Sequence, residues 1–309
     1  MKENNLIEII KNTLNSKYIN DDCAYLEDLG IVVTQDSLVE DVHFSLKYTT
    51  AFQLGYKSVA VNLSDVYASG ARAKYLTCSL SLPNYIDENF IKDFYEGAKS
   101  VNSEVEIVGG DVTGSDKLFI SICAIGETKN RKISSRSSAK EGYKIITNGV
   151  HGSSGCGFEL LQRGSTSPQV LVDAHLMPKV NDILSNEIAL NIKENYAMMD
   201  SSDGLMDALY KISKLSNLTA EVDFNKIPID EEIKEFEDYK NKIFFGAEDY
   251  NLIACVPEEF LKTLDKNLYT EIGFMTKKQE DVFVKVRFAD EVRSFTENDV
   301  EEKTFKHFD

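Results

Sequence analysis

The stretch AFQLGYKSVAVNLSDVYAS, residues 51–69, has the spacing of a helix that is apolar over most of its surface. One face carries apolar residues at four- and three-residue steps: Phe52, Tyr56, Val59, Leu63 and Val66. A polar stripe follows the same spacing: Ser58, Asn62, Asp65 and Ser69. Because an unpaired buried carboxylate is costly, this stripe faces water, a partner or a cavity. The pattern alone does not choose between a solvated face and a functional one.

Outward from this helix, strand-like and helical segments are mixed along the chain. Runs rich in β-branched residues predict strands at Ile31–Thr34, Leu76–Leu82, Leu118–Ile125, Tyr143–Thr147, Ala220–Phe224, Leu252–Val256 and Val282–Phe288. Helical periodicity predicts helices at Leu6–Leu14, Ala51–Ser69, Glu88–Asn102, Gly155–Gln162, Asn181–Ile192 and Leu205–Leu215. This mixture indicates an α/β or mixed α+β fold. The polar segment Lys129–Gly142 predicts a domain boundary, which divides the chain into residues 1–135 and 136–309.

The composition excludes several classes of protein. The chain has 309 residues and a net charge of −17, so it repels nucleic acid and anionic membrane surfaces. A phosphate ligand would therefore need metal ions or local Arg and Lys residues. The five cysteines include no CxxC pair, which favours reduced thiols and a cytoplasmic location. We expect no signal peptide and no membrane span, because the N-terminal segment is amphipathic and no apolar run approaches about 18 residues.

Acidic residues recur where predicted strands end or where the chain turns. Each has an ordinary interpretation as a turn or helix-capping residue. Together they favour Mg²⁺, a small hard cation that prefers oxygen ligands. A convergent set of this many aspartates would suit several ions along a polyphosphate. These residues are Asp21 and Asp22, Asp36 after Thr34 and Gln35, Asp65, Asp111 after Gly109 and Gly110, Asp200 and Asp203, and Glu248 and Asp249.

Other kinds of site have no support in the sequence. There is no GxxxxGK(S/T) phosphate loop, no HRD and DFG pair, no HExxH and no GxSxG. The glycine-rich segment Gly152–Gly157 resembles a phosphate loop before a helix, but a tight start of the helix is the simpler interpretation.

The motifs in this order resemble the thiamine-monophosphate kinase family. That family is part of the ATP-binding superfamily that includes aminoimidazole ribonucleotide synthetase and selenophosphate synthetase. The resemblance covers almost the whole chain and depends on the ordered set of motifs. The matching stretches are DDCA (21–24), DSLVEDVHF (36–44), AVNLSD (60–65), GGDVT (109–113), DSSDGL (200–205), EDY (248–250) and the terminal His307-Phe308.

The resemblance implies an α/β N-terminal domain that forms a homodimer through its sheet, followed by an α+β C-terminal domain. It implies that ATP phosphorylates thiamine monophosphate to give thiamine diphosphate and ADP. The implied Mg²⁺ ligands are Asp22, Thr34, Gln35, Asp36, Asp65, Asp111, Asp200 and Asp203. The implied contacts to ATP are Gly110, Asp111, Arg136 and Ser202, and those to the thiamine phosphate are His43, Glu248 and Phe305. Gln35 stands where the family usually has Thr or Ser, so its role as a ligand is the least supported of these.

This reaction agrees with the residue types present. A phosphomonoester has a second pKa of about 6, so the attacking oxygen is already deprotonated at neutral pH and no catalytic residue is expected. Metal ions and Arg136 would screen the repulsion between two anions. Two alternatives stay open: another ATP-dependent enzyme of the same superfamily, and a non-catalytic divalent-cation-binding protein. The second would favour calcium-type DxDxDG spacing, which is absent.

Overall fold

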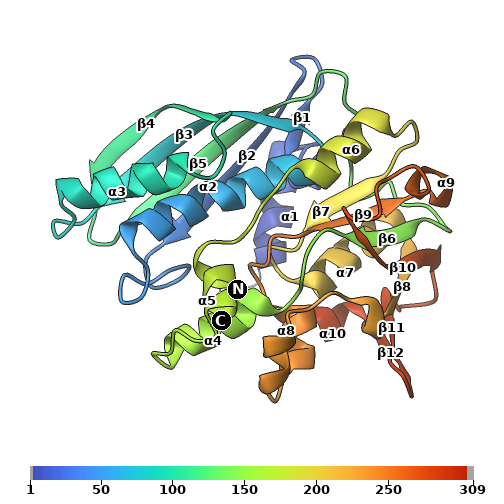
Figure 1. Cartoon of the computed structure of the whole chain (residues 1–309). Helices are drawn as coiled ribbons and strands as arrows, with labels where there is room; N and C mark the ends of the chain where they lie inside the picture. Colours follow the sequence, from blue (N-terminus) through green and yellow to red (C-terminus); the bar gives the residue numbers. More distant parts are fainter. Residues whose placement is uncertain (1–2, 305–309) are drawn as a thin grey trace.

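The computed structural model describes residues 3–304, and within them the chain builds two β-sheets (Figure 1). The first sheet has five strands, all from the N-terminal part of the chain. Its order is β1 (Ala24–Leu26), β2 (Ile31–Val39), β5 (Phe119–Glu127), β3 (Arg72–Leu82) and β4 (Glu106–Gly114). Neighbouring strands are antiparallel except for β3 and β4, which are parallel.

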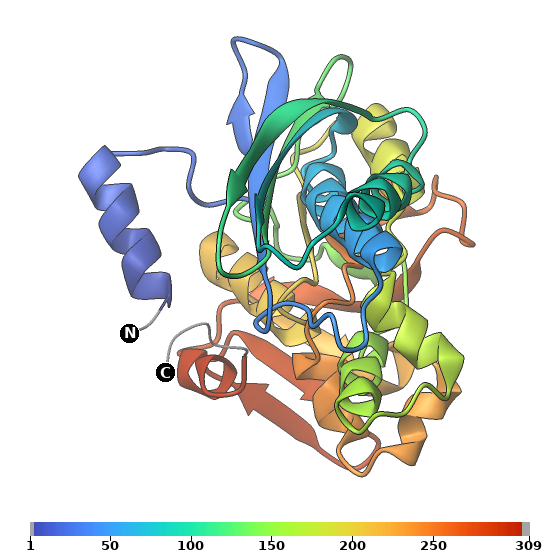
Figure 2. The ribbon, with the colours of Figure 1, turned by 90° about the vertical axis from the view of Figure 1, so that its left-hand side faces the viewer.

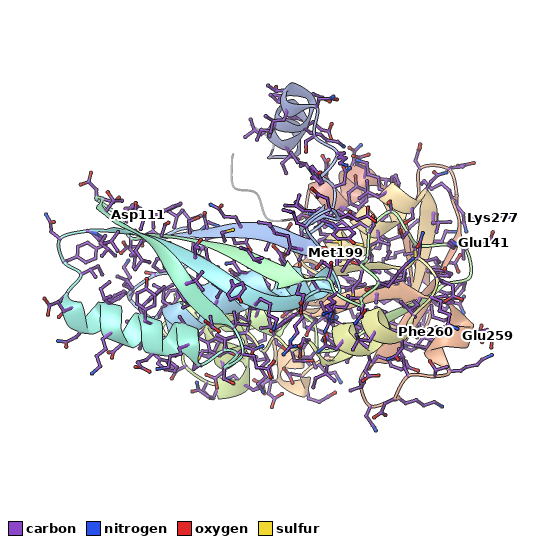
Figure 3. The ribbon with its side chains drawn as sticks, turned by 90° about the horizontal axis from the view of Figure 1, so that it is seen from above. Asp111, Glu141, Met199, Glu259, Phe260 and Lys277 are labelled. Carbon is purple, nitrogen blue, oxygen red and sulfur yellow. The ribbon has the colours of Figure 1, made fainter. Side chains whose placement is uncertain are left out.

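Two helices cover one face of this sheet and leave the other face open. Helix α2 (Ala51–Ala68) begins at a capping box of Thr50 and Gln53, and it packs against α3 (Glu88–Lys99). The two helices meet at glycines, because a Cβ on Gly55 would lie 1.8 Å from the Phe94 carbonyl oxygen, and one on Gly97 would lie 1.9 Å from that of Phe52. In Figures 2 and 3, α2 and α3 lie on one side of the sheet, and α1 (Glu3–Leu14) lies on the other.

The second sheet is built from the C-terminal part of the chain. Its seven strands have the order β12 (Val292–Phe295), β11 (Val284–Arg287), β8 (Leu218–Asp223), β10 (Thr270–Lys277), β6 (Lys144–Thr147), β9 (Leu252–Val256) and β7 (Ala197–Asp200). The remaining helices are α4 (Ser153–Gln162), α5 (Gln169–Leu176), α6 (Ile183–Asn191), α7 (Leu205–Ser216), α8 (Tyr239–Phe245), α9 (Glu258–Leu261) and α10 (Glu297–Glu301). Two 3₁₀ turns, Phe224–Lys226 and Glu231–Glu235, complete the described elements.

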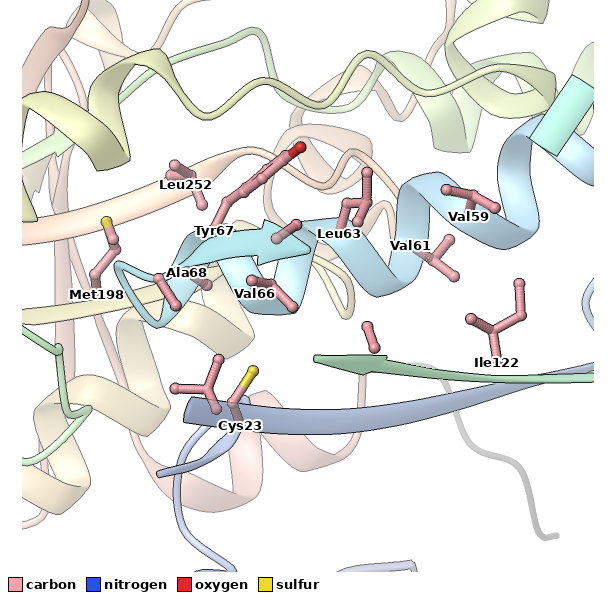
Figure 4. Packing of buried hydrophobic residues seen from close by; sticks show 14 of the residues in the cluster. Cys23, Val59, Val61, Leu63, Val66, Tyr67, Ala68, Ile122, Met198 and Leu252 are labelled. Carbon is pink, nitrogen blue, oxygen red and sulfur yellow. The ribbon is translucent and has the colours of Figure 1, made fainter. Parts of the chain in front are cut away.

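Helix α2 lies between the two sheets and joins their cores. Its residues pack on β2 and β5 of the first sheet and on β7 and β9 of the second. Val59, Leu63 and Val66 share one hydrophobic cluster with Met198 of β7 and Leu252 of β9 (Figure 4). A helix packed on both sides has little surface left for water, which explains why so much of residues 51–69 is apolar.

The predicted mixed fold is confirmed, and several element boundaries are corrected. Strand β2 continues past Thr34 to Val39, so Asp36 lies inside the strand and not after it. Gly109, Gly110 and Asp111 are also inside a strand, β4, and do not form a turn. Gly110 has a steric reason to be there, because a Cβ would lie 1.8 Å from the Cys78 carbonyl oxygen on β3. The predicted boundary at residues 135 and 136 lies in the segment between β5 and β6.

Two further observations concern the chain as a whole. Among the described residues, no helix has the length and apolar character that crossing a membrane requires. All five cysteines are free thiols, and four of them are buried.

Candidate active site

Three aspartates that are far apart in sequence meet at the contact between the two sheets. Asp22 precedes β1, Asp65 lies on α2, and Asp200 ends β7. Each offers a carboxylate oxygen, and these oxygens all lie within 4.8 Å of one another. The sequence predicted each of these residues separately, and the fold brings them together.

Hydroxyl groups orient two of these carboxylates, and an amide side chain of α2 bonds to the backbone of β2. The Thr34 hydroxyl donates to Asp65 Oδ2 at 2.6 Å, and the Ser64 hydroxyl donates to Asp200 Oδ2 at 2.5 Å. The Asn62 side-chain oxygen accepts a hydrogen bond from the backbone N–H of Asp36 at 3.1 Å. The polar stripe of α2 therefore faces β2 and the acidic cluster. Its interpretation as a solvated face is wrong.

Burial and mutual repulsion disfavour the ionised form of these carboxylates, so their pKa values are raised when no cation is bound. Burial, together with the charges of Asp203 and Asp22, raises the pKa of Asp36 to about 6. Burial and the charge of Asp22 raise the pKa of Asp200 to about 7. Burial, Asp36 and Asp200 raise the pKa of Asp65 well above its usual range. A site of this kind gains stability when a cation binds.

The donor set fits Mg²⁺. All the candidate ligand atoms are oxygens, from carboxylates and from the hydroxyls beside them, which a small hard cation prefers. Within residues 3–304, the group of side chains that lie close enough to share an ion consists of three aspartates and includes no soft donor. Arg136 already supplies one positive charge, because its Nη2 lies 2.7 Å from Asp22 Oδ1 and its backbone N–H donates to Asp21 at 2.7 Å.

Asp203 has a different environment from the three clustered aspartates. Its side chain is 43% exposed, and its Oδ2 lies 3.1 Å from the ammonium of Lys211. Lys211 also pairs with Asp207 at 2.7 Å. Asp203 is therefore a more accessible carboxylate that already has a lysine partner beside it.

A cleft of about 600 Å³ extends from the acidic residues to an aromatic region of the second sheet's helices. Asp36, Asp65, Ser202 and Asp203 line one part of it. The other part is lined by His43, Phe158, His175, Phe245, Glu248 and Tyr250. His43 Nδ1 accepts a hydrogen bond from the Val39 backbone N–H at 3.1 Å. The cleft thus combines an acidic end with an end that has aromatic walls and a carboxylate.

The glycine-rich segment 152–157 forms the start of α4, and its amides are already bonded. The carboxylate of Asp249 accepts from the backbone N–H of Gly152 at 2.6 Å and from that of Ser154 at 2.9 Å. A carboxylate at this position suits the helix dipole. Within the protein the segment is thus a tight helix start that anchors the loop carrying Glu248.

Three predicted site residues, Gln35, Gly110 and Asp111, lie away from the acidic cluster. Gln35 lies on the opposite face of β2 from Thr34 and Asp36, and its amide donates to Ser121 at 2.9 Å. Asp111 on β4 pairs with Ser79 on β3, and Ser79 pairs with Ser121 on β5. Ser121 in turn pairs with Ser37 on β2, so three strand spacings separate Asp111 from β2. With strands about 4.8 Å apart, Gly110 and Asp111 are therefore about 14 Å from β2 across the sheet. Figure 3 shows Asp111 at the outer end of this sheet, far from Met199 beside the cluster. Phe305 lies outside the described residues.

Several residues of the site were not predicted from the sequence. Ser64 and His175 have no distinguishing local pattern, because a serine in a helix and a lone histidine are common. Lys57 had a signal, since it and Asp65 are the only charged residues in α2. Asp249 was noted as part of a motif, but its role as a helix cap depends on a contact across 95 residues.

Comparison with known proteins first defines the class. Residues 20–128 match the family described as AIR synthase related protein, N-terminal domain, and residues 140–285 match the corresponding C-terminal domain. The fold and the acidic cleft between its two sheets are therefore those of an AIR-synthase-related protein.

Full-length relatives narrow this class. A thiamine-monophosphate kinase of Aquifex aeolicus is 34% identical over 98% of this chain and 97% of its own length. The enzyme of the same description from Bacillus subtilis is 31% identical over 94% of this chain and 93% of its own. A solved structure described as AaThiL complexed with AMPPCP and TMP matches 99% of this chain and 97% of its own, with a TM-score of 0.85 at 31% identity. The chain belongs to the thiamine-monophosphate kinase family.

Proposed function

We propose that this chain uses ATP to phosphorylate thiamine monophosphate, giving thiamine diphosphate and ADP. The observation that carries the proposal is the single cleft, which joins buried carboxylates suited to metal-bound phosphates to an aromatic end that contains Glu248. An aromatic wall and a carboxylate suit a cationic, nitrogen-containing heterocycle. The relatives described as thiamine-monophosphate kinases and the solved complex with AMPPCP and TMP support the same assignment.

The residues of the cleft act through charge and position. The acceptor phosphate supplies its own nucleophilic oxygen, since its second pKa is about 6, and no side chain has to remove a proton. Asp22, Asp36, Asp65 and Asp200 would hold Mg²⁺, with Thr34 and Ser64 fixing the orientation of two of these carboxylates. Bound Mg²⁺ supplies neutralising charge to phosphate oxygens. Arg136 lies beside Asp22 and adds a fixed positive charge that stabilises the transferring group.

Ser202 and Asp203 form the rim of the acidic end, and Lys211 pairs with Asp203. The Ser202 hydroxyl donates to Asp200 at 2.8 Å. A nucleotide that contacts the backbone or hydroxyl of Ser202 would therefore lie next to the proposed metal ligand Asp200. We assign Asp203 to a further ion that competes with the ammonium of Lys211. Residues 1–135 then supply most of the metal ligands and residues 136–309 complete the nucleotide and acceptor sites. The free thiols are consistent with a reaction in the cytoplasm.

A homodimer would explain the position of Asp111. The open face of the first sheet carries the exposed Tyr75 and the half-buried Val33 and Ile125, an apolar surface that no described helix covers. Asp111 and Gln35 lie on the same face. We propose that two protomers pair through it, so that Gly110 and Asp111 of one protomer contribute to the site of the other.

One assay tests the proposed function directly. The purified protein is incubated with ATP, Mg²⁺ and thiamine monophosphate, and the products are separated by chromatography. We expect thiamine diphosphate and ADP in equal amounts, and none after chelation of the metal. A protein that binds ATP but forms no thiamine diphosphate would refute the proposal.

A further inference from the structure

Helix α2 carries a buried lysine that faces the acceptor end of the cleft. Lys57 is 1% exposed, and its Nζ lies 2.9 Å from Oε2 of Glu248, which is 191 residues away in sequence. A buried ammonium is costly unless it is paired, and losing one partner leaves the other charge uncompensated. The two charges therefore depend on each other.

A second group from another helix contacts the same carboxylate oxygen. His175 of α5 places its Nδ1 3.3 Å from Glu248 Oε2, and its ring packs against Phe158 with 5.2 Å between centroids. Burial and the nearby Lys57 charge lower the pKa of His175 to about 3, so the imidazole is neutral. The Ser154 hydroxyl lies 3.2 Å from the same nitrogen, so Nδ1 faces both that hydroxyl and the carboxylate, and the ring tautomer decides whether it accepts or donates. The contacts from Lys57 and His175 both fall on Oε2 of Glu248, and Oε1 takes part in neither.

The backbone holds Glu248 in this position at a conformational cost. Glu248 has φ of +68° and Tyr250 has φ of +53°, a region that non-glycine residues seldom adopt. Asp249 between them is anchored to the amides of Gly152 and Ser154. The Glu248 backbone N–H also donates to the Ser202 carbonyl at 2.6 Å, which links the loop to the rim of the acidic end. Glu248 is thus held by Lys57 through its side chain, by Ser202 through its backbone, and by the anchored neighbour Asp249.

We propose that Lys57 is a positioning residue for acceptor recognition, which holds Oε2 of Glu248 so that the ionised carboxylate presents Oε1 to an N–H donor of the acceptor's heterocycle. This inference rests on the proposed function, and it adds a residue from α2 to the acceptor site. Because α2 also carries Asp65, one rigid helix then fixes both the metal end and the acceptor end of the cleft. The distance between donor and acceptor groups is set within a single element.

The test replaces Lys57 with methionine, which keeps the length of the side chain and removes its charge. We expect the KM for thiamine monophosphate to rise about 30-fold, because truncating one partner of a buried charge pair has an effect of this order. The kcat and the KM for ATP should stay within about threefold, since the metal ligands are unchanged. Lys92, exposed on α3, gives a matched control, and Lys92→Met should behave as the unaltered protein does.

A pH series separates positioning from a general structural role. Burial raises the pKa of Glu248, and the charge of Lys57 outweighs this effect, so the pKa is lowered overall. His175 and His43 are the imidazoles that face the same carboxyl. The anionic or phenolic groups near it are Asp249, Tyr48 and Tyr250. Without Lys57 the carboxyl of Glu248 should protonate more readily. The ratio of the KM for thiamine monophosphate in Lys57→Met to that in the unaltered protein should therefore grow as the pH falls. A ratio independent of pH would indicate a packing defect.

A double variant keeps the proposal testable if Lys57→Met folds poorly. Lys57→Met combined with Glu248→Gln contains no unpaired charge at this position, so it should fold, as thermal unfolding would check. The inference predicts that Lys57→Met adds no more than about twofold to the KM in the Glu248→Gln background, since both act through the same carboxylate. An equal penalty in both backgrounds would overturn it. The unaltered protein's formation of thiamine diphosphate tests the proposed function separately.

Discussion

Replacing Asp65 with asparagine should make the metal-free protein more stable and the enzyme inactive. Asparagine keeps the shape of the side chain and an oxygen that can accept from Thr34, so the hydrogen bond at 2.6 Å can persist. It removes the charge that repels Asp22 and Asp200, whose oxygens lie within 4.8 Å. The same charge is needed to hold a divalent cation. Stability and function should therefore change in opposite directions.

The size of the effect follows from the geometry. At 4.8 Å and an effective dielectric constant of about 20, two carboxylates repel by about 3 kcal/mol, so Asp65 experiences roughly twice that from its two neighbours. Holding the carboxyl neutral at about pH 7.5 has a cost of similar size, about 5 kcal/mol relative to the unfolded chain. Arg136 offsets part of the repulsion, and we expect a net gain of about 2 kcal/mol. For a chain of this length, a gain of this size raises Tm by about 3 °C.

Thermal unfolding in excess chelator measures this change, with Asp290→Asn as the control. Asp290 is an exposed aspartate outside the cleft, and its substitution should leave Tm within about 1 °C. Adding Mg²⁺ should raise the Tm of the unaltered protein and of the control, and should have less effect on Asp65→Asn. Formation of thiamine diphosphate by Asp65→Asn should fall by about a thousandfold or more. A lower Tm in chelator, or an unchanged response to Mg²⁺, would refute this account of the cluster.

Three further predictions follow from other parts of the structure. The pKa values of Asp36 and Asp200, about 6 and about 7, lie above the unfolded value of 3.8, so the metal-free protein binds protons on folding and loses stability as the pH rises through those values. The difference in Tm with and without Mg²⁺ should accordingly grow from about pH 5 to about pH 8, and a constant difference would contradict the raised pKa values. Gly97→Ala should cost about 3 kcal/mol in urea unfolding because its Cβ would meet a carbonyl of α2, whereas Gly114→Ala, with no atom within 4 Å, should cost less than about 0.5 kcal/mol. Tyr75→Lys on the open sheet face should convert a dimer to monomers in sedimentation velocity, whereas Val292→Lys on the exposed strand β12 should not; dimers that persist in Tyr75→Lys would argue against pairing through this face.

The sequence predicted the parts of this molecule that local patterns determine. Residues 51–69 have a helical period that packing reinforces, so the predicted helix differs from α2 by one residue. The acidic motifs could be noted one by one because each is short, and the fold places Asp22, Asp65 and Asp200 close together. The prediction that Asp36 follows a strand failed because polar residues continue β2 on its open face, where Gln35 and Ser37 alternate with the buried side. Alternation on a half-open sheet resembles the end of a strand when only apolar residues are counted.

Contacts between distant segments could not be predicted in this way. Nothing near Lys57 in sequence indicates that its partner is Glu248, and the cap that Asp249 places on α4 joins two segments of the chain 95 residues apart. The strand β7, Ala197–Asp200, is only four residues long and fully buried, so it has no alternation to detect. Such pairings depend on how the two sheets pack around α2, which is a property of the whole fold.

The position of α2 accounts for the polar groups in its otherwise apolar sequence. A helix buried between two sheets can carry charge only where each charge has a partner from another element. Asp65 is accommodated because Thr34 donates to it and a cation can neutralise it together with Asp22 and Asp200. Lys57, eight residues earlier and about 12 Å along the helix, is accommodated because Glu248 meets it. The two charged residues thus face the two ends of one cleft, a separation that suits a phosphate donor at one end and the heterocycle of an acceptor at the other.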